Sequence, residues 1–155
     1  MKSIILKLRS LIWFILNWIE MKRKKVSYRS FPKINGVIHC HGSGKIVIGE
    51  NVRINSSYSS NPIGGSEKTI LSTRSKDGQI IIGDRVRMSN SAIVAQDKVL
   101  IEEDVFIGGN CKIYDTDFHS LNFKERTGHV LEIVKSKPIV IHRGAFVGAH
   151  CIILK

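Results

Sequence analysis

The stretch Val99–His119, VLIEEDVFIGGNCKIYDTDFH, decides the fold. Within it an isoleucine recurs every six residues, at Ile101, Ile107 and Ile113. An amphipathic helix needs apolar residues three and four apart, and a half-buried strand needs them two apart. A six-residue period fits neither pattern, but it fits a β-solenoid with one short strand on each face of a triangular coil. The period stops at residues 115–119, where a polar loop with a histidine indicates a site held by a rigid scaffold.

The same period appears elsewhere in the chain. Its other positions are Ile48 and Ile54, then Ile82, Met88 and Val94, then Ile141, Val147 and Ile153. Two polar stretches, residues 55–79 and 114–137, interrupt the period, and we interpret them as loops inserted into the coil. The alternative is a β-sandwich with strands rich in valine and isoleucine. That fold explains the composition but not the period, so the sequence predicts an all-β solenoid.

The length, net charge and cysteine count of the chain limit the classes of function. The 155 residues form at most one ordinary domain, and their net charge of +11 indicates an anionic partner. Nucleic acid is the least favoured partner, because the basic residues cluster beside an apolar helix and no aromatic stacking residues are interleaved with them. The three cysteines lack Cys-x-x-Cys spacing, which argues for a reducing compartment and against a disulfide framework.

Residues 4–19, IILKLRSLIWFILNWI, have the spacing of an amphipathic helix. The apolar positions on one face are Ile4, Ile5, Leu8, Leu11, Ile12, Ile15, Leu16 and Ile19. The run is too short and too interrupted to span a bilayer, and no small-residue cleavage site follows it. Trp13, Trp18 and the basic tract Met21–Lys25 favour a position on an anionic membrane surface. A helix that packs as a cap on one end of the solenoid explains the pattern equally well.

We divide the chain into residues 1–30, the helix with its basic tract, and residues 31–155, the solenoid. The segment His39–His41 contains two histidines around a cysteine, but alternate residues of a strand point to opposite sides. At most two of these side chains share a face, so we expect no metal site there. The chain stops at Lys155, in the middle of a hexad, which predicts a fragment of a longer protein or an end covered by a partner.

Several motifs resemble the hexapeptide-repeat acyltransferases, which fold as left-handed parallel β-helices. The resemblance covers roughly residues 34–155 and depends on the in-phase hexads and on IYDTDFHS and KPIVIHRGAFVGAHCII. Within that superfamily, SNPIGG, IIIGDRVRMSNSAIVA and the N-terminal helix are similar to bacterial O-acetyltransferases of exopolysaccharide, capsule and lipopolysaccharide pathways. The resemblance implies a homotrimer with active sites between neighbouring subunits, acetyl-CoA as co-substrate, and no metal.

The resemblance also implies roles for individual residues. His119 lies at the position of the catalytic histidine, and a histidine can take the proton from a sugar hydroxyl as it attacks a thioester. Asp117 is the preferred catalytic partner, which orients the imidazole, and Asp115 is expected to bind an acceptor hydroxyl. Asn90 is expected on the acceptor side of the site. The alternatives are a loop histidine with a structural hydrogen bond and a corner asparagine that satisfies its own turn.

The candidate residues for coenzyme A are Phe146, Gly148 and Ala149. Ala149 matches a small residue along the pantetheine arm, and Phe146 replaces the more usual tryptophan. The implied reaction transfers an acetyl group from acetyl-CoA to a sugar hydroxyl of a cell-surface polysaccharide or its lipid-linked precursor. In the family the hexads continue through further coils that line the coenzyme A groove. The alternative is therefore a catalytically inactive fragment that lacks those coils.

The resemblance implies a cytoplasmic protein of bacteria. The helix and basic tract, residues 4–25, add the inner face of the cytoplasmic membrane as a candidate place of peripheral contact. An enzyme like the zinc-dependent γ-carbonic anhydrases is a further alternative. It needs three converging histidines, and the separation of His142 and His150 does not match that pattern.

Overall fold

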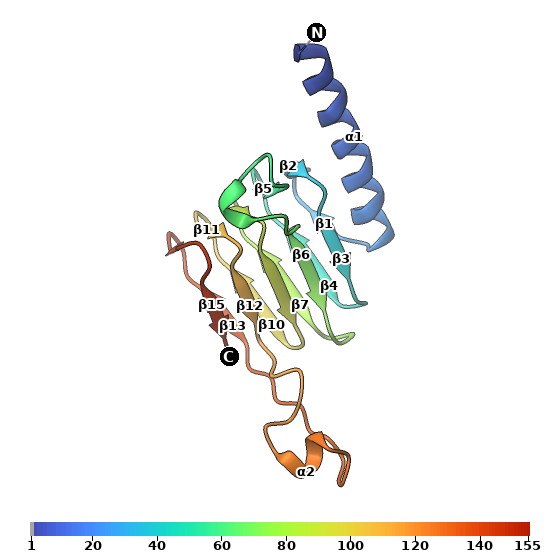
Figure 1. Cartoon of the computed structure of the whole chain (residues 1–155), viewed down its shortest axis with the longest axis vertical. Coiled ribbons are helices and arrows are strands. Elements are labelled where there is room, and N and C mark those ends of the chain that lie inside the picture. The colour runs from blue at the N-terminus through green and yellow to red at the C-terminus, as the bar shows by residue number, and fades with distance from the viewer. Residues whose placement is uncertain (1) are drawn as a thin grey trace.

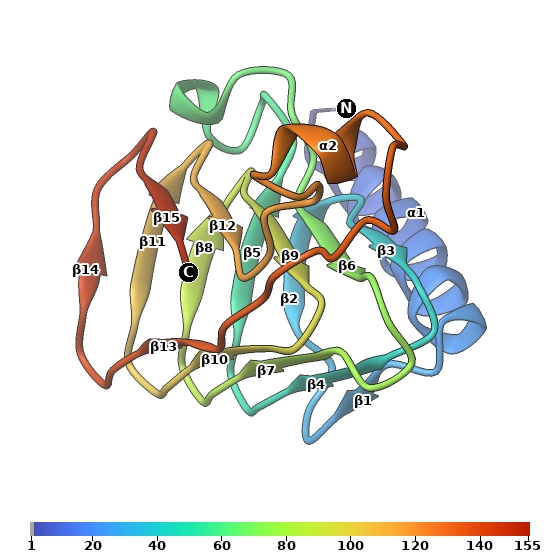
Figure 2. The same cartoon turned by 90° about the horizontal axis from the view of Figure 1, so that it is seen from below.

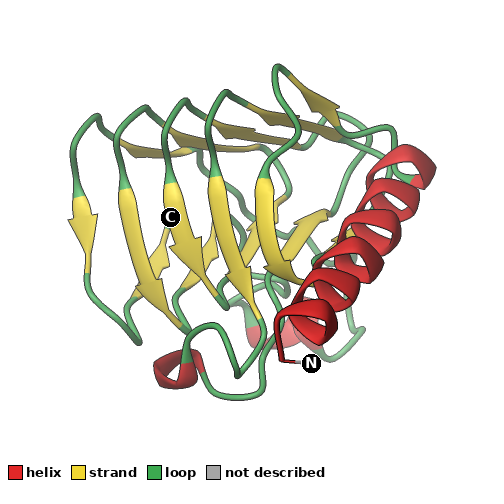
Figure 3. Cartoon of the chain, turned by 90° about the horizontal axis from the view of Figure 1, so that it is seen from above, coloured by secondary structure: helices red, strands yellow, loops and turns green. Residues whose placement is uncertain are grey.

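The computed structural model describes residues 2–155 and shows a parallel β-helix with one long helix at its N-terminal end (Figure 1). The helical elements are α1 (Lys2–Arg23), the short α2 (Phe123–Arg126) and the 3-10 turn η1 (Pro62–Gly64). The strands of these residues form three parallel sheets of five strands each, which we name A, B and C. Successive coils lie side by side, and α1 lies along one end of the stack (Figures 2 and 3).

Each coil passes once through each sheet. Sheet A consists of β1 (Ser27–Tyr28), β4 (Lys45–Ile48), β7 (Gln79–Ile82), β10 (Lys98–Ile101) and β13 (Ile139–Ile141). Sheet B consists of β2 (Lys33–Gly36), β5 (Arg53–Ser56), β8 (Arg87–Ser89), β11 (Phe106–Gly109) and β14 (Phe146–Val147). Sheet C consists of β3 (His39–His41), β6 (Ile70–Thr73), β9 (Ala92–Ala95), β12 (Lys112–Tyr114) and β15 (Ile152–Leu154).

The six-residue period corresponds to one step around the coil. Ile101 lies in β10, Ile107 in β11 and Ile113 in β12, so consecutive isoleucines belong to sheets A, B and C. Between coils the strands pair in register, with Ile101 opposite Ile82 on one side and opposite Ile141 on the other. The predicted fold class, an all-β parallel β-helix with an N-terminal helix, is confirmed.

The core is the axis of the coil. Ile101 and Ile113 are fully buried and Ile107 is almost so, and the residues two places before them are buried as well. These earlier residues are Val99, Val105 and Cys111. Burial of each large aliphatic side chain contributes roughly 1.5–3 kcal/mol, so the stacked positions supply most of the driving force for folding.

The corner between sheets B and C repeats a left-handed backbone residue in each of three coils. Asn90, Asn110 and His150 occupy it, with φ of 44°, 59° and 61°. Positive φ is uncommon for residues other than glycine, and asparagine and histidine are among those that adopt it most readily. The prediction that Asn90 lies at a coil corner is confirmed.

Two loops leave the coil, at residues 57–69 between β5 and β6 and at residues 115–138 between β12 and β13 (Figure 1). The first is shorter than the predicted insertion 55–79, because Ile70–Thr73 forms β6 and pairs with β3 and β9. Only Leu71 marks this strand as a core element, since its second buried residue is Thr73. The β-helix also begins before residue 31, because β1 pairs with β4.

α1 is longer than the predicted helix 4–19 and includes part of the basic tract. It contacts β2 and β3 of the first coil, and the ring of Phe14 packs on that of Phe31 with centroids 4.8 Å apart. Within residues 2–155, no helix combines the length and the apolar character that are needed to cross a membrane.

Candidate active site

A buried aspartate anchors the loop 115–138 to the coil. Asp115 follows β12 directly, and its carboxylate accepts hydrogen bonds from the backbone amides of Gln96 (2.7 Å) and Asp97 (2.8 Å), in the turn between β9 and β10. On the returning side of the loop, the amide of Lys137 donates to the carbonyl of Asp115 (2.9 Å). The base of the loop is therefore fixed, while its tip with α2 projects from the coil (Figure 1).

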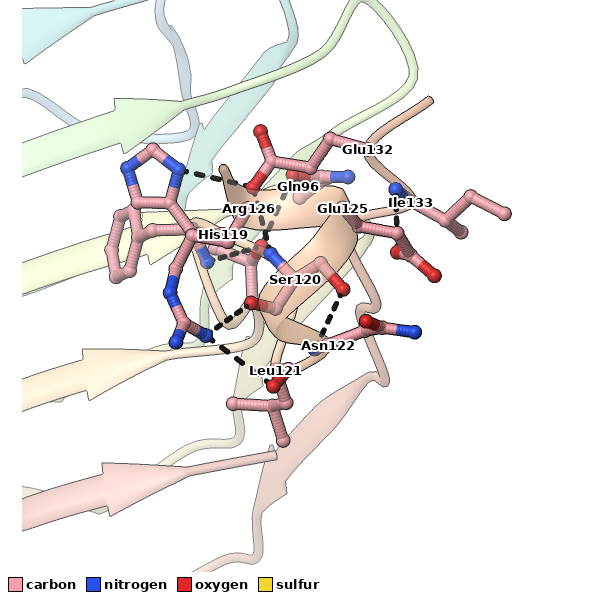
Figure 4. Close-up of polar contacts among 11 residues, drawn as sticks. Gln96, His119, Ser120, Leu121, Asn122, Glu125, Arg126, Glu132 and Ile133 are labelled. Atoms are coloured by element: carbon pink, nitrogen blue, oxygen red, sulfur yellow. Dashed lines mark hydrogen bonds and ion pairs between the residues drawn. The ribbon is translucent and has the colours of Figure 1, made fainter. Parts of the chain in front are cut away.

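His119 is held in this loop by Glu132, a carboxylate that the sequence analysis does not single out. Its Nδ1 lies 3.2 Å from Oε1 of Glu132, which also accepts a hydrogen bond from the amide of Ser120 (2.8 Å; Figure 4). The Ser120 amide and then the imidazole lower the pKa of Glu132, so this carboxylate is ionised near neutral pH. An ionised carboxylate only accepts hydrogen bonds, so in the neutral imidazole the tautomer that this contact favours has its proton on Nδ1 and its lone pair on Nε2.

The backbone on both sides of His119 is fixed by further contacts. Phe118 has a φ of 63°, and its ring packs edge-to-face on Tyr114 with centroids 5.2 Å apart. Arg126 of α2 donates to the carbonyl of Ser120 (2.9 Å; Figure 4). The imidazole itself is 70% exposed, so a hydroxyl group can approach it from solvent. A fixed backbone and an accessible ring are what a general base requires.

The predicted partners of His119 have other contacts. The carboxylate of Asp117 forms an ion pair with Lys155 (Oδ2–Nζ 2.9 Å), and the oxygens of Asp115 accept the two backbone amides at the base of the loop. The position next to the imidazole belongs to Glu132. The signal available in the sequence was a carboxylate in the same interrupted stretch as the histidine, but no motif or period distinguishes it from the other acidic residues there.

Asn90 lies at the corner between β8 and β9, beneath the loop 57–69. Its Nδ2 donates to the carbonyl of Glu67 (2.6 Å), whereas its Oδ1 is buried without a hydrogen-bond partner among the described residues. Gly64 covers it so closely that an added Cβ would lie 2.4 Å from the Cβ of Asn90. The Oδ1 of Asn110, at the same corner of the next coil, is likewise without a partner among the described residues, so this feature belongs to the corner and does not distinguish Asn90.

Asn90 and His119 lie at opposite ends of the strands of sheet C. Asn90 precedes β9, whereas His119 follows the C-terminal end of the parallel neighbour β12. Five residue steps separate Asn90 from the far end of β9, and at about 3.3 Å per residue this is roughly 16 Å. The predicted base and the predicted acceptor residue therefore do not converge within one chain.

The candidate residues for coenzyme A lie together beside a groove on the outer face of sheet B. Phe146 is 78% exposed and faces Phe106 across β14 and β11. Gly148 and Ala149 follow β14 and pack against Gly108, where an added Cβ would lie 2.5 Å from the nitrogen of Ala149. The groove has a volume of about 360 Å³, and both phenylalanines and Gly108 line it. It is thus apolar at this end.

The other end of the groove presents a column of cations. Lys33 faces Arg53, which faces Arg87, across β2, β5 and β8. All three side chains are exposed, and none forms an ion pair with a carboxylate in the part of the chain that the structure describes. The guanidinium of Arg87 lies 5.1 Å from the ring centroid of Phe106. Like charges stacked on neighbouring strands are destabilising, so this column indicates a surface that meets anions.

Outside the loop, the side chains of His39, His142 and His150 lie near those of Glu20, Glu102 and Asn110, respectively. As predicted from strand alternation, His39 and His41 lie exposed while Cys40 between them is buried, and burial raises the pKa of its thiol to about 12. The Nδ1 of His142 lies 3.3 Å from Glu102. Within residues 2–155, no group of three or more histidine, cysteine or acidic side chains is gathered in a way that could hold a metal ion.

No protein-family model, curated protein or solved structure matches the chain.

Proposed function

We propose that the chain is an acyl-CoA-dependent O-acetyltransferase that acts on a sugar hydroxyl of a cell-surface polysaccharide or its precursor. The observation that carries the proposal is the contact between His119 and Glu132 on a loop anchored to a parallel β-helix. The hexads, the DTDFHS segment and this fold together resemble the hexapeptide-repeat acyltransferases. His119 is the general base, and Glu132 takes the orienting role that the sequence analysis expects of Asp117.

The reaction needs one base that later acts as an acid. Nε2 of His119 accepts the proton of the sugar hydroxyl while the hydroxyl oxygen forms a bond to the thioester carbonyl carbon. The carbon–sulfur bond then breaks, and the imidazolium returns the proton to the leaving thiolate. The ionised carboxylate of Glu132 stabilises the imidazolium between these two steps. A general base of this kind contributes on the order of 10²–10⁴-fold.

The groove on sheet B fits the chemistry of an acyl-CoA donor. Phe106, Phe146 and Gly108 offer an apolar surface for the pantetheine arm, beside Gly148 and Ala149. The cation column offers positive charge for the phosphates at the other end. Four strand spacings separate Phe146 from Lys33, which at about 4.8 Å each gives roughly 19 Å, a length suited to an extended ligand.

The proposed site lies between copies of the chain. The loop 115–138 leaves the coil between β12 of sheet C and β13 of sheet A, at the corner opposite sheet B. His119 of one copy therefore cannot reach the groove on sheet B of the same copy. A homotrimer, which the resemblance implies, can place the loop 115–138 of one copy over sheet B and Asn90 of the next. This arrangement also explains why His119 and Asn90 lie at opposite ends of the strands of sheet C.

Two histidine variants test the proposal. Acetyl transfer from acetyl-CoA to a panel of oligosaccharides would be followed by mass spectrometry of the sugar product. We expect His119→Ala to lower kcat/KM by about 10²–10⁴-fold, because the base is lost. His142→Ala removes a histidine with a similar carboxylate contact, 3.3 Å from Glu102, and should retain activity. Unchanged turnover by a folded His119→Ala variant contradicts the proposal.

A further inference from the structure

Helix α1 attaches to the β-helix through its polar side. Asn17 is fully buried, and its Nδ2 donates to the carbonyl of Gly36 (2.9 Å) while its Oδ1 accepts from the amide of Ile38 (2.9 Å). One turn later, Oε1 of Glu20 accepts from the amide of Cys40 (2.9 Å). These backbone groups belong to the first coil, which has no preceding coil in the described chain to pair with. α1 therefore caps the coil with an amide and a carboxylate.

The apolar side of α1 consequently faces solvent. Its exposed large apolar residues, each between 42% and 71% exposed, are Ile4, Ile5, Leu6, Leu8, Leu11, Ile12, Phe14, Ile15, Leu16, Trp18 and Ile19. The whole apolar face predicted from the sequence belongs to this set. The N-terminal part of the helix extends beyond the coils (Figure 1), so the β-helix does not cover it. Contiguous apolar surface of this extent marks a place of contact with another phase or partner.

The charged residues of α1 indicate what kind of partner covers its apolar face. Lys7, Arg9 and Lys22 flank the apolar face, whereas Glu20, the one acidic residue of the helix, binds the coil and forms an ion pair with Arg23 (2.6 Å). The guanidinium of Arg9 lies 4.6 Å from the ring of Trp13, and the ammonium of Lys22 lies 4.8 Å from that of Trp18. Tryptophan and basic residues beside an apolar helix face are typical of helices that lie in the headgroup region of anionic bilayers.

We propose that α1 docks the protein on an anionic lipid bilayer, lying in the plane of its surface with the polar side still attached to the β-helix. Pairing of α1 with a second copy would also cover the apolar face. It would, however, bring Lys7, Arg9 and Lys22 of two helices together, while the one acidic residue of each helix, Glu20, is already paired with Arg23. Anionic headgroups supply the missing negative charge, and the net charge of +11 adds to the attraction.

The test measures sedimentation of the full chain with vesicles of phosphatidylcholine, alone or with about 30% phosphatidylglycerol. Wild-type protein should bind the anionic vesicles, bind neutral ones more weakly, and be released as NaCl rises from about 0.1 M to about 0.5 M. Leu11→Asp/Ile15→Asp places two charges one turn apart on the exposed face, and we expect it to weaken binding at least about 100-fold. Lys7→Gln/Arg9→Gln should mainly reduce the salt dependence.

A matched control places the same charges elsewhere. Leu121 and Leu131 are 79% and 85% exposed in the loop 115–138, so Leu121→Asp/Leu131→Asp should leave vesicle binding unchanged. Thermal unfolding would show that each variant is folded. Three results overturn the inference: no binding of wild-type protein to anionic vesicles, wild-type binding by folded Leu11→Asp/Ile15→Asp, or self-association through α1 that excludes lipid. Acetyl transfer to a soluble oligosaccharide should not change in this variant, so the proposed function is tested separately.

Discussion

Two of the three histidine–glutamate contacts among the described residues, those of His119 and His142, have nearly the same local geometry and different surroundings; the third, His39–Glu20, lies at the helix cap. In both, one carboxylate oxygen lies near Nδ1 of the histidine, at 3.2 Å for His119–Glu132 and 3.3 Å for His142–Glu102, and accepts the amide of the next residue at 2.8 Å. His142 lies in a turn of the regular coil, whereas His119 lies on a loop that leaves it. The contact alone is a way to satisfy a backbone amide, and its place in the fold decides whether the histidine is available for a reaction.

The largest difference in stability is expected at the base of the loop. Asp115→Ala removes a fully buried carboxylate and leaves the amides of Gln96 and Asp97 unpaired, which should cost about 2–4 kcal/mol. Glu102→Ala removes a solvent-accessible carboxylate and should cost much less, because an exposed ion pair is screened by water. Urea unfolding measures both values. Equal destabilisation by the two variants would mean that the loop is not anchored through Asp115.

A smaller effect is expected on catalysis when the two glutamates are neutralised. Glu132→Gln can still accept the amide of Ser120 but no longer stabilises an imidazolium, so kcat should fall about 10- to 100-fold with little change in KM. Glu102→Gln makes the same chemical change in the other contact and should leave kcat as in wild type. The ratio of the kcat values of the two variants measures how much more the glutamate beside His119 contributes to catalysis than the one beside His142. A ratio near one would remove Glu132 from the mechanism.

The smallest effect is expected in the titration of the two carboxylates, where the contacts should behave alike. In each case the backbone amide is the first cause of a lowered pKa, and the histidine adds to it. A lowered pKa in the folded state stabilises the protein above the unfolded value of about 4.3, and this contribution is lost as the pH falls through the folded pKa. NMR titration should place both carboxyls below that value. A normal pKa for either one would mean that its contact is absent in solution.

The sequence predicted the scaffold because the scaffold is periodic. Ile101, Ile107 and Ile113 each fill the same place in the coil, so the period of the sequence is the period of the structure. β6 escaped this reasoning because only one of its two buried residues, Leu71, is apolar. The insertion was therefore predicted to be longer than it is.

The site was less predictable, since it depends on contacts between residues distant in the sequence. A motif marks His119 as a candidate base, but its neighbour Glu132 has no fixed spacing to it, because a loop follows no period. The direction of α1 was also hidden from sequence analysis. The apolar face of the helix was predicted correctly, but its orientation was not. The open edge of the first coil has amides and carbonyls that need partners, and it binds Asn17 and Glu20. The apolar face on the other side of the helix therefore points to solvent.

The pairing of β10 with β13 has a consequence for how such a protein can change. Val99 and Ile101 lie opposite Ile139 and Ile141 in unbroken register, although the whole loop 115–138 is inserted between these strands. The entropic cost of closing a loop rises only with the logarithm of its length. The loop can therefore be lengthened, shortened or exchanged while the coil keeps its register.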